Sequence, residues 1–259
     1  MKKVIFSSMI LVATFTINVA AQNNTLSARE KLEGWVLLFD GKSFDGWRGY
    51  NGTEMPSVWS IDHEQQAMKI APAARNPGGR PQPPPRVEGA PRPPANDIIY
   101  GGKKFLNFEL SIDWKVDPRA NSGIFYYVQE IPGQAIFASG IEVQILDNCA
   151  WPPTDNRATR NMAGSLYDMK PALPPNAKCA GEWNNIRIWV KDGVVEHIQN
   201  GVKVVEYTIW TEEWAKLLAD SKFHDWPHFA KSREGGFIGL QDHNDFSVWF
   251  RNIKIRELK

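Results

Sequence analysis

The chain lacks the charge imbalance of proteins that bind nucleic acid or membrane surfaces. Its 259 residues include 30 Lys and Arg against 29 Asp and Glu, which gives a formal net charge of +1 at pH 7. This balance excludes a bulk electrostatic attraction to nucleic acid or to an anionic membrane. Beyond the first apolar run there is no second stretch of about 20 apolar residues, so no membrane span is expected in the rest of the chain.

Residues 1–21 have the features of a signal peptide. Lys2 and Lys3 give a positive start, an apolar run extends from Val4 to about Val19, and small residues precede Gln22. The sequence has no cysteine near this cleavage point that could carry a lipid anchor. We therefore expect residues 1–21 to be removed and the mature chain to be periplasmic or secreted in a bacterium. Residues 22–32 then form an N-terminal tail.

The sequence has only two cysteines, Cys149 and Cys179. In an oxidising compartment an even pair favours a disulfide. This bond would close a loop of about 30 residues and stabilise the fold by roughly 3–4 kcal/mol in the chain-entropy model. The pair lacks the ligand spacing of a zinc site, so a metal site here is not expected.

Short strand-like segments recur along the chain and predict its fold class. They lie at 35–39, 59–62, 68–70, 108–116, 123–128, 136–137, 140–146, 186–190, 194–199, 202–207, 236–241 and 248–255. Asn200-Gly201 predicts a hairpin turn, because both residues tolerate positive φ. Thr211 can cap one short helix that runs to about Ala219. Many strands and a single helix predict an all-β protein, an antiparallel β-sandwich that forms one domain over residues 33–258.

Residues 72–95 interrupt this pattern. Half of the chain's 18 prolines lie in this segment, together with four arginines. Such a segment cannot form a sheet ladder, so we expect an extended or polyproline-like insertion loop. It is either a lid or rim near a binding face or a surface insertion without a direct role.

The segment 140–147 gives the clearest indication of function. Its apolar and polar residues alternate, which predicts a strand with one face in the core and with Glu142 and Gln144 together on the other. Asp147 would need a bulge or the strand end to join them. Carboxylate and amide groups on one sheet face suit sugar chemistry, which needs groups that move protons and groups that hold hydroxyls. The alternative is an exposed strand with ordinary solvated side chains.

Eight fragments that follow one another along the chain carry a family resemblance. They lie at 34–41 with Trp47, 121–126, 142–148, 164–168, 180–184, 196–201, 239–243 and 250–255. In this order the chain resembles the 3-keto-disaccharide hydrolase domain family, and the resemblance spans roughly residues 33–258. It implies a concanavalin A-like jelly-roll sandwich and cleavage of the glycosidic bond in a sugar already oxidised at C3. The chain departs from the family pattern at Cys149 and Cys179, which supports a disulfide between these two loops.

The implied chemistry fixes which groups the site needs. A ketone at C3 acidifies the C2 proton, so the site requires a base near C2, donors for the enolate oxygen and an acid near the leaving oxygen. Glu142 and His243 are the predicted proton-transfer residues, with acid and base not assigned between them. The predicted substrate-binding residues are Gln144, Asp147, Tyr167, Asp168, His197, Gln241 and Arg251. His197 can equally be a packing residue of its strand face, and Asp168 a turn residue.

The sequence requires no cofactor. His224 and His228 have the i, i+4 spacing of helical metal ligands, but Pro227 interrupts any helix between them. A divalent ion that binds a ketone and a hydroxyl of the sugar would be chemically sensible. The sequence has no oxygen-rich loop that requires such an ion, so it leaves open whether the protein binds a metal.

Two other functions stay open, and each has a carbohydrate as the partner. The first is a retaining glycosidase on unmodified glycans, which needs two carboxylates about 5–5.5 Å apart. The amide of Gln144 and the short side chain of Asp147 argue against it. The second is a non-catalytic carbohydrate-binding module, because fold alone does not fix function. The expected substrate in the main interpretation is an oligosaccharide or a 3-keto-glycoside.

Overall fold

The structure is a computed structural model that describes residues 22–71, 96–243 and 246–259. The expected signal peptide and the Pro-rich insertion at 72–95 lie outside the described residues. Within the described ranges, no helix is both long and apolar enough to cross a membrane.

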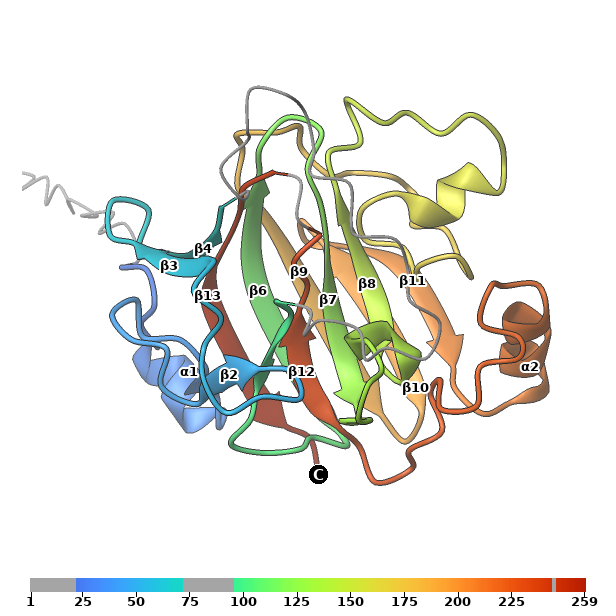
Figure 1. The fold of residues 1–259 in the computed structure, drawn as a ribbon, viewed down its shortest axis with the longest axis horizontal. Helices are drawn as coiled ribbons and strands as arrows, with labels where there is room; N and C mark the ends of the chain where they lie inside the picture. Colours follow the sequence, from blue (N-terminus) through green and yellow to red (C-terminus); the bar gives the residue numbers. More distant parts are fainter. Residues whose placement is uncertain (1–21, 72–95, 244–245) are drawn as a thin grey trace, which may run out of the picture.

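Two antiparallel sheets pack against each other (Figure 1). In the larger sheet the strand order is β11 (Val202–Thr208), β10 (Val194–Gln199), β9 (Asn184–Lys191), β6 (Phe108–Val116), β13 (Val248–Glu257), β4 (Ala67–Ile70) and β3 (Trp59–Asp62), and β1 (Val36–Leu37) also pairs with β13. The smaller sheet has the order β2 (Trp47–Gly49), β5 (Ile98–Tyr100), β12 (Phe237–Leu240), β7 (Asn121–Val128) and β8 (Ile141–Leu146). The predicted all-β sandwich of two antiparallel sheets is confirmed.

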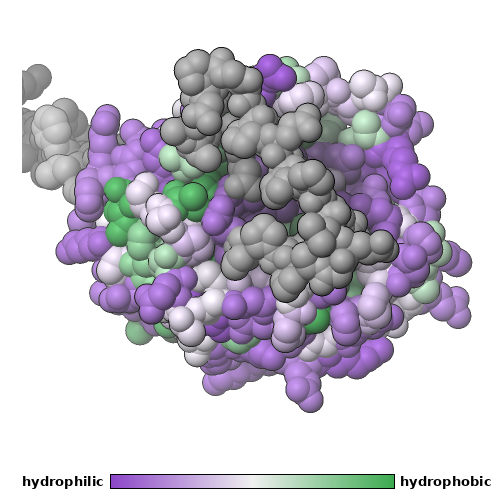
Figure 2. All heavy atoms as spheres, in the orientation of Figure 1, coloured by the Kyte–Doolittle hydropathy of each residue, from purple (hydrophilic) through white to green (hydrophobic). Residues whose placement is uncertain are grey.

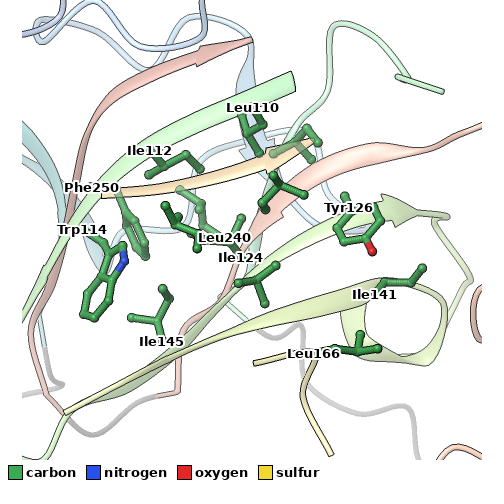
Figure 3. Packing of buried hydrophobic residues seen from close by; sticks show 14 of the residues in the cluster. Leu110, Ile112, Trp114, Ile124, Tyr126, Ile141, Ile145, Leu166, Leu240 and Phe250 are labelled. Carbon is green, nitrogen blue, oxygen red and sulfur yellow. The ribbon is translucent and has the colours of Figure 1, made fainter. Parts of the chain in front are cut away.

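The core lies between the sheets and is built by strand alternation. Ile112 and Phe250 of the larger sheet face Ile124 and Ile145 of the smaller one (Figure 3), and all four are fully buried. Each such side chain contributes about 1.5–3 kcal/mol through burial. Around the sandwich, hydrophilic residues dominate the surface visible in Figure 2. The apolar face of each sheet is therefore used for packing, which leaves the other face of the smaller sheet for a site.

The helices agree only partly with the sequence prediction. The predicted helix is confirmed as α2 (Glu212–Ala219), and the hydroxyl of Thr211 caps it by accepting the Trp214 N–H at 3.2 Å. The prediction of a single helix is wrong, because α1 (Ala28–Leu32) lies in the expected N-terminal tail. A reciprocal capping box between Ser27 and Glu30 stabilises this one short helix.

Three short elements also differ from the prediction. Residues 136–137 were expected to form a strand, but they belong to the 3-10 helix η1 (Ile136–Ala138). Ile136 packs with Phe125 and Ile99 in a small second apolar cluster on the outer face of the smaller sheet, so it covers this sheet rather than extending it. The sequence analysis missed β2 and β5, because strands of three residues are too short to show an alternation.

The predicted disulfide is confirmed. Cys149 and Cys179 are bonded, and their Cα atoms lie 5.6 Å apart. The bond ties the loop that follows β8 to the segment that precedes β9. It thereby restrains one end of the smaller sheet, next to the strand that carries Glu142.

Candidate active site

A pocket of about 150 Å³ opens on the outer face of the smaller sheet. The core-facing residues of β8 alternate with Glu142 and Gln144, so these two side chains point away from the core and into the pocket. The described lining residues are Asn121, Phe137, Glu142, Gln144, Tyr167, Lys222, Gln241 and His243. The pocket therefore collects residues from β7, β8, η1 and three loops that are distant in the sequence.

Glu142 is the buried acid of this pocket, with only 5% of its surface exposed. Burial raises the pKa of its carboxyl group to about 8; the positive charge of Lys222 opposes this shift and the negative charge of Asp97 adds to it. Gly123 on the neighbouring strand β7 gives the carboxyl group its space, because a Cβ atom there would lie 2.5 Å from the Glu142 Oε1. The group can thus exchange a proton near neutral pH.

Gln144 and Gln241 bring amide groups to the same pocket. The side-chain oxygen of each is buried and has no hydrogen-bond partner among the described residues. The backbone fixes both residues: the Gln144 N–H donates to the Ser165 carbonyl at 3.1 Å, and the Gln241 N–H donates to the Gly123 carbonyl at 3.0 Å. A buried hydrogen-bond acceptor without a donor destabilises a protein by about 1–3 kcal/mol. These oxygens are therefore suited to accept hydrogen bonds from the hydroxyl groups of a sugar.

Lys222 lies in the pocket although no sequence pattern marked it. Its ammonium nitrogen lies 4.0 Å from the ring centre of Tyr167, and its backbone N–H donates to the Asp168 Oδ2 at 2.7 Å. The residue as a whole is exposed, but partial burial lowers the pKa of its ammonium group, while the carboxyl groups of Glu142 and Asp168 raise it. Lys222 follows helix α2 and lies in none of the family-like fragments.

Tyr167 lines the pocket as predicted, and Asp168 does not. The Tyr167 N–H donates to the Glu142 carbonyl at 3.1 Å, and burial raises the pKa of the Tyr167 hydroxyl to about 12. Asp168 is 7% exposed and has a φ of 58°, and its carboxylate binds the backbone of Lys222. The prediction that Asp168 binds the substrate is corrected, because it positions Lys222 instead.

Asp147 and Arg251 are also outside the pocket. The Asp147 carboxylate accepts the backbone N–H groups of Arg119 at 2.9 Å and Cys149 at 3.2 Å, so it closes the turn after β8 rather than joining Glu142. Arg251 lies on β13 in the other sheet, with its guanidinium carbon 3.8 Å from the ring centre of Trp183. The predictions that these two residues bind the substrate are therefore corrected.

His197 is buried inside the sandwich. It lies on β10 with none of its surface exposed, and its Nδ1 is 2.8 Å from the Gly164 carbonyl oxygen. The Gly164 N–H in turn donates to the Gln144 carbonyl at 2.8 Å. The packing alternative is the correct one, so the prediction that His197 contacts the substrate is corrected. His197 supports the loop that borders the pocket.

The burial of His197 makes the stability of the protein depend on pH in the acidic range. Burial lowers its pKa to about 4 from the ordinary value of 6.5, so the unfolded chain binds a proton that the folded protein does not between these pH values. We expect the free energy of unfolding to fall by at most about 1.4 kcal/mol per pH unit from pH 6.5 towards 4 for this reason. Urea titrations should show a shallower fall for His197→Gln. The exposed His228→Gln is the control, and equal slopes for His197→Gln and the wild type would contradict the assignment.

Asp97 is a second buried acid that the sequence analysis missed. It is 3% exposed, its carboxylate accepts the Asp242 N–H at 2.9 Å, and burial raises its pKa to about 7. Ile98 pairs with Leu240, so Asp97 lies beside Gln241 on the pocket face of the sheet. Asp97 therefore anchors the segment that leads to His243.

The described residues contain no cluster of three or more His, Cys, Asp or Glu side chains arranged to hold a metal ion.

Comparison with known proteins places the chain in a family. Residues 34–256 match the model of the 3-keto-alpha-glucoside-1,2-lyase-like domain. The chain belongs to this family. A 3-keto-disaccharide hydrolase of Bacteroides thetaiotaomicron is similar to this chain, with 39% identity in an alignment that covers 92% of the chain and 83% of the relative. The predicted family resemblance is thereby confirmed.

Two solved structures of similar proteins share the fold. A proposed glycosyl hydrolase of Parabacteroides distasonis has 29% sequence identity and a TM-score of 0.76, with coverage of 92% of this chain and 100% of that one. A second proposed glycosyl hydrolase of the same organism has 26% identity and a TM-score of 0.61, with coverage of 86% and 99%. The sandwich of this lyase-like domain is thus also found in related proteins.

Proposed function

We propose that the protein cleaves the glycosidic bond of 3-keto-glycosides or 3-keto-disaccharides. Its family membership and its similarity to the 3-keto-disaccharide hydrolase support this substrate class. The observation that carries the proposal is the position of Glu142, the only carboxylate among the described lining residues, next to the open amide oxygens of Gln144 and Gln241. This set can move one proton and hold several hydroxyls.

Glu142 is the proposed base. It removes the C2 proton, and the electron pair of the C–H bond becomes an enolate with its negative charge on the C3 oxygen. A carboxyl group whose pKa burial raises to about 8 is a stronger base than an exposed one. The enolate then reforms the ketone, makes a C1–C2 double bond and expels the glycosidic oxygen. Addition of water across that double bond completes a net hydrolysis.

His243 is the proposed acid for the leaving oxygen. It lies at the exposed rim of the pocket, after the last residue of β12. A departing sugar at the rim can reach the imidazole, whereas C2 must lie deeper, near Glu142. The side-chain oxygens of Gln144 and Gln241 accept hydrogen bonds from hydroxyl groups of the sugar ring. These bonds hold the C2 atom next to the Glu142 carboxylate.

The same geometry argues against an ordinary retaining glycosidase. Such an enzyme needs two carboxylates about 5–5.5 Å apart. The polar neighbour of Glu142 on its strand is the amide Gln144, and the Asp147 carboxylate is bound to the Arg119 and Cys149 backbone. The Asp97 carboxylate is buried and is not among the described lining residues. A ketone that acidifies C2 removes the need for a second carboxylate as nucleophile.

A comparison of two sugars tests the proposal. The protein is incubated with a plain disaccharide and with its 3-keto form, and the released monosaccharide is followed by NMR. We expect cleavage of the keto form only. Cleavage of the plain sugar would indicate a glycosidase, and binding of either sugar without cleavage would indicate a binding module. Both results would contradict the proposal.

We also propose that the protein acts outside the cytoplasm. The signal-like sequence of residues 1–21 and the disulfide between Cys149 and Cys179 support export. Sequencing the N-terminus of the protein recovered from its natural host should give Gln22 as the first residue. A mature chain that retains Lys2 and Lys3 would contradict export by this route.

A further inference from the structure

The proposed reaction creates a negative charge that the residues discussed so far do not neutralise. When the C2 proton moves to Glu142, the carboxylate loses its charge and the C3 oxygen gains one. Gln144 and Gln241 offer amide groups without a net charge. Among the described lining residues, Lys222 is the one with an ammonium group, and it comes from a loop that the family-like fragments do not include.

We propose that Lys222 is a catalytic residue whose ammonium group stabilises the enolate oxygen formed at C3. This inference rests on the proposed function and adds an electrophile to it. Lys222 lines the same pocket as Glu142, and the two charges interact. The ammonium group can therefore pair first with the Glu142 carboxylate and then with the enolate, as the negative charge passes from one to the other.

Two neighbours hold Lys222 in this position. Asp168 is buried, and its Oδ2 accepts the Lys222 backbone N–H at 2.7 Å, so the start of the side chain is fixed. The ring of Tyr167 lies beneath the ammonium nitrogen at 4.0 Å from the ring centre. Attraction between a cation and an aromatic ring is worth about 0.5–2 kcal/mol. The group is thus held in place before a substrate arrives, which is what electrostatic stabilisation of a transition state requires.

Tyr167 and Asp168 are positioning residues in this scheme. The Tyr167 N–H donates to the Glu142 carbonyl at 3.1 Å, and the Tyr167 ring contacts the Lys222 ammonium group. Tyr167 therefore links the proposed base to the proposed electrophile. Loss of a single preorganised charge partner typically costs about 10²–10³-fold in kcat. We expect an effect of this size for Lys222.

The test separates formation of the enolate from cleavage. Wild type, Lys222→Met and Lys222→Arg are compared on a 3-keto-disaccharide, and exchange of the C2 proton with D2O is followed by NMR. The matched control is Lys216→Met, an exposed lysine on helix α2. We expect Lys222→Met to lower kcat and the exchange rate by about 10²–10³-fold with a smaller change in KM. Arginine should restore part of both rates, and Lys216→Met should match the wild type.

Several results would overturn the inference while leaving the proposed function intact. One is cleavage by folded Lys222→Met within about twofold of the wild type. Another is a change confined to KM, which would make Lys222 a binding residue only. A third is a covalent sugar adduct on Lys222 after borohydride treatment, because it would show an imine in place of an ion pair. If the wild type fails to cleave any keto sugar, the proposed function itself is wrong.

Discussion

Replacement of Glu142 by glutamine is expected to lower kcat/KM on a 3-keto-disaccharide by about 10²–10⁴-fold, the usual contribution of a positioned base. Glutamine preserves the shape of the side chain but cannot take up the C2 proton. If Glu142 is the base, wild-type kcat/KM should also rise with pH and level off above its pKa of about 8. Activity that falls across the same range would make Glu142 the acid, and unchanged turnover by Glu142→Gln would remove it from the mechanism.

The same substitution is expected to stabilise the protein at high pH. Burial raises the pKa of Glu142 from 4.5 to about 8, so the folded protein retains a proton that the unfolded chain releases between these values. Stability must therefore fall as the pH rises from 4.5 to 8. Glutamine does not titrate, so calorimetry should show the melting temperature of Glu142→Gln falling less over this range. The exposed Glu206→Gln is the control and should follow the wild type; parallel curves for Glu142→Gln would contradict the raised pKa.

Substitution of Gly123 by alanine is expected to lower kcat/KM by about 100-fold without unfolding the protein. The added Cβ atom would lie 2.5 Å from the Glu142 Oε1 and 3.0 Å from its Cδ and Cγ atoms. The carboxyl group must rotate away, and a displacement of about 1 Å can cost about 10²-fold in rate. The fold should persist, because the clash is with a side-chain end and not with backbone.

A matched control makes this test specific. Gly52 lies in a loop away from the pocket, and a Cβ atom there would be in ordinary contact at 3.6 Å from the Gly49 carbonyl oxygen. Gly52→Ala should therefore retain full activity. Kinetic constants and melting temperatures of both variants decide the matter. Full activity of Gly123→Ala would mean that the observed position of the Glu142 carboxyl group is not the active one.

The centre of the site could be predicted from the sequence because it depends on local geometry. In β8 the alternation of residues 141–146 places Glu142 and Gln144 on one face whatever the rest of the fold does. Gln241 and His243 were found through a family-like fragment, and the structure brings them to the same pocket. Strand alternation thus fixed which residues share a face, and the resemblance indicated which strands matter.

The remaining residues could not be predicted because they depend on tertiary packing. Alternation shows that His197 shares a face with other residues of its strand, but it cannot tell that this face is the interior. Arg251 lies in a family-like fragment on the other sheet. Conversely, Lys222 and Asp97 reach the pocket region from segments without any pattern, and only the packed sheets reveal them.

The bond between Cys149 and Cys179 makes the stability of the protein depend on the redox conditions under which it folds. Without the bond, the unfolded chain would regain the conformational entropy that closure of a loop over a 30-residue separation removes. In the folded protein, the turn closed by Asp147 would no longer be linked to the segment before β9. A copy retained among cellular thiol reductants would thus be the less stable form, with a looser end of the smaller sheet. The redox state of this pair would thus act on the stability of the fold and not directly on substrate recognition, since neither cysteine is among the described lining residues of the pocket.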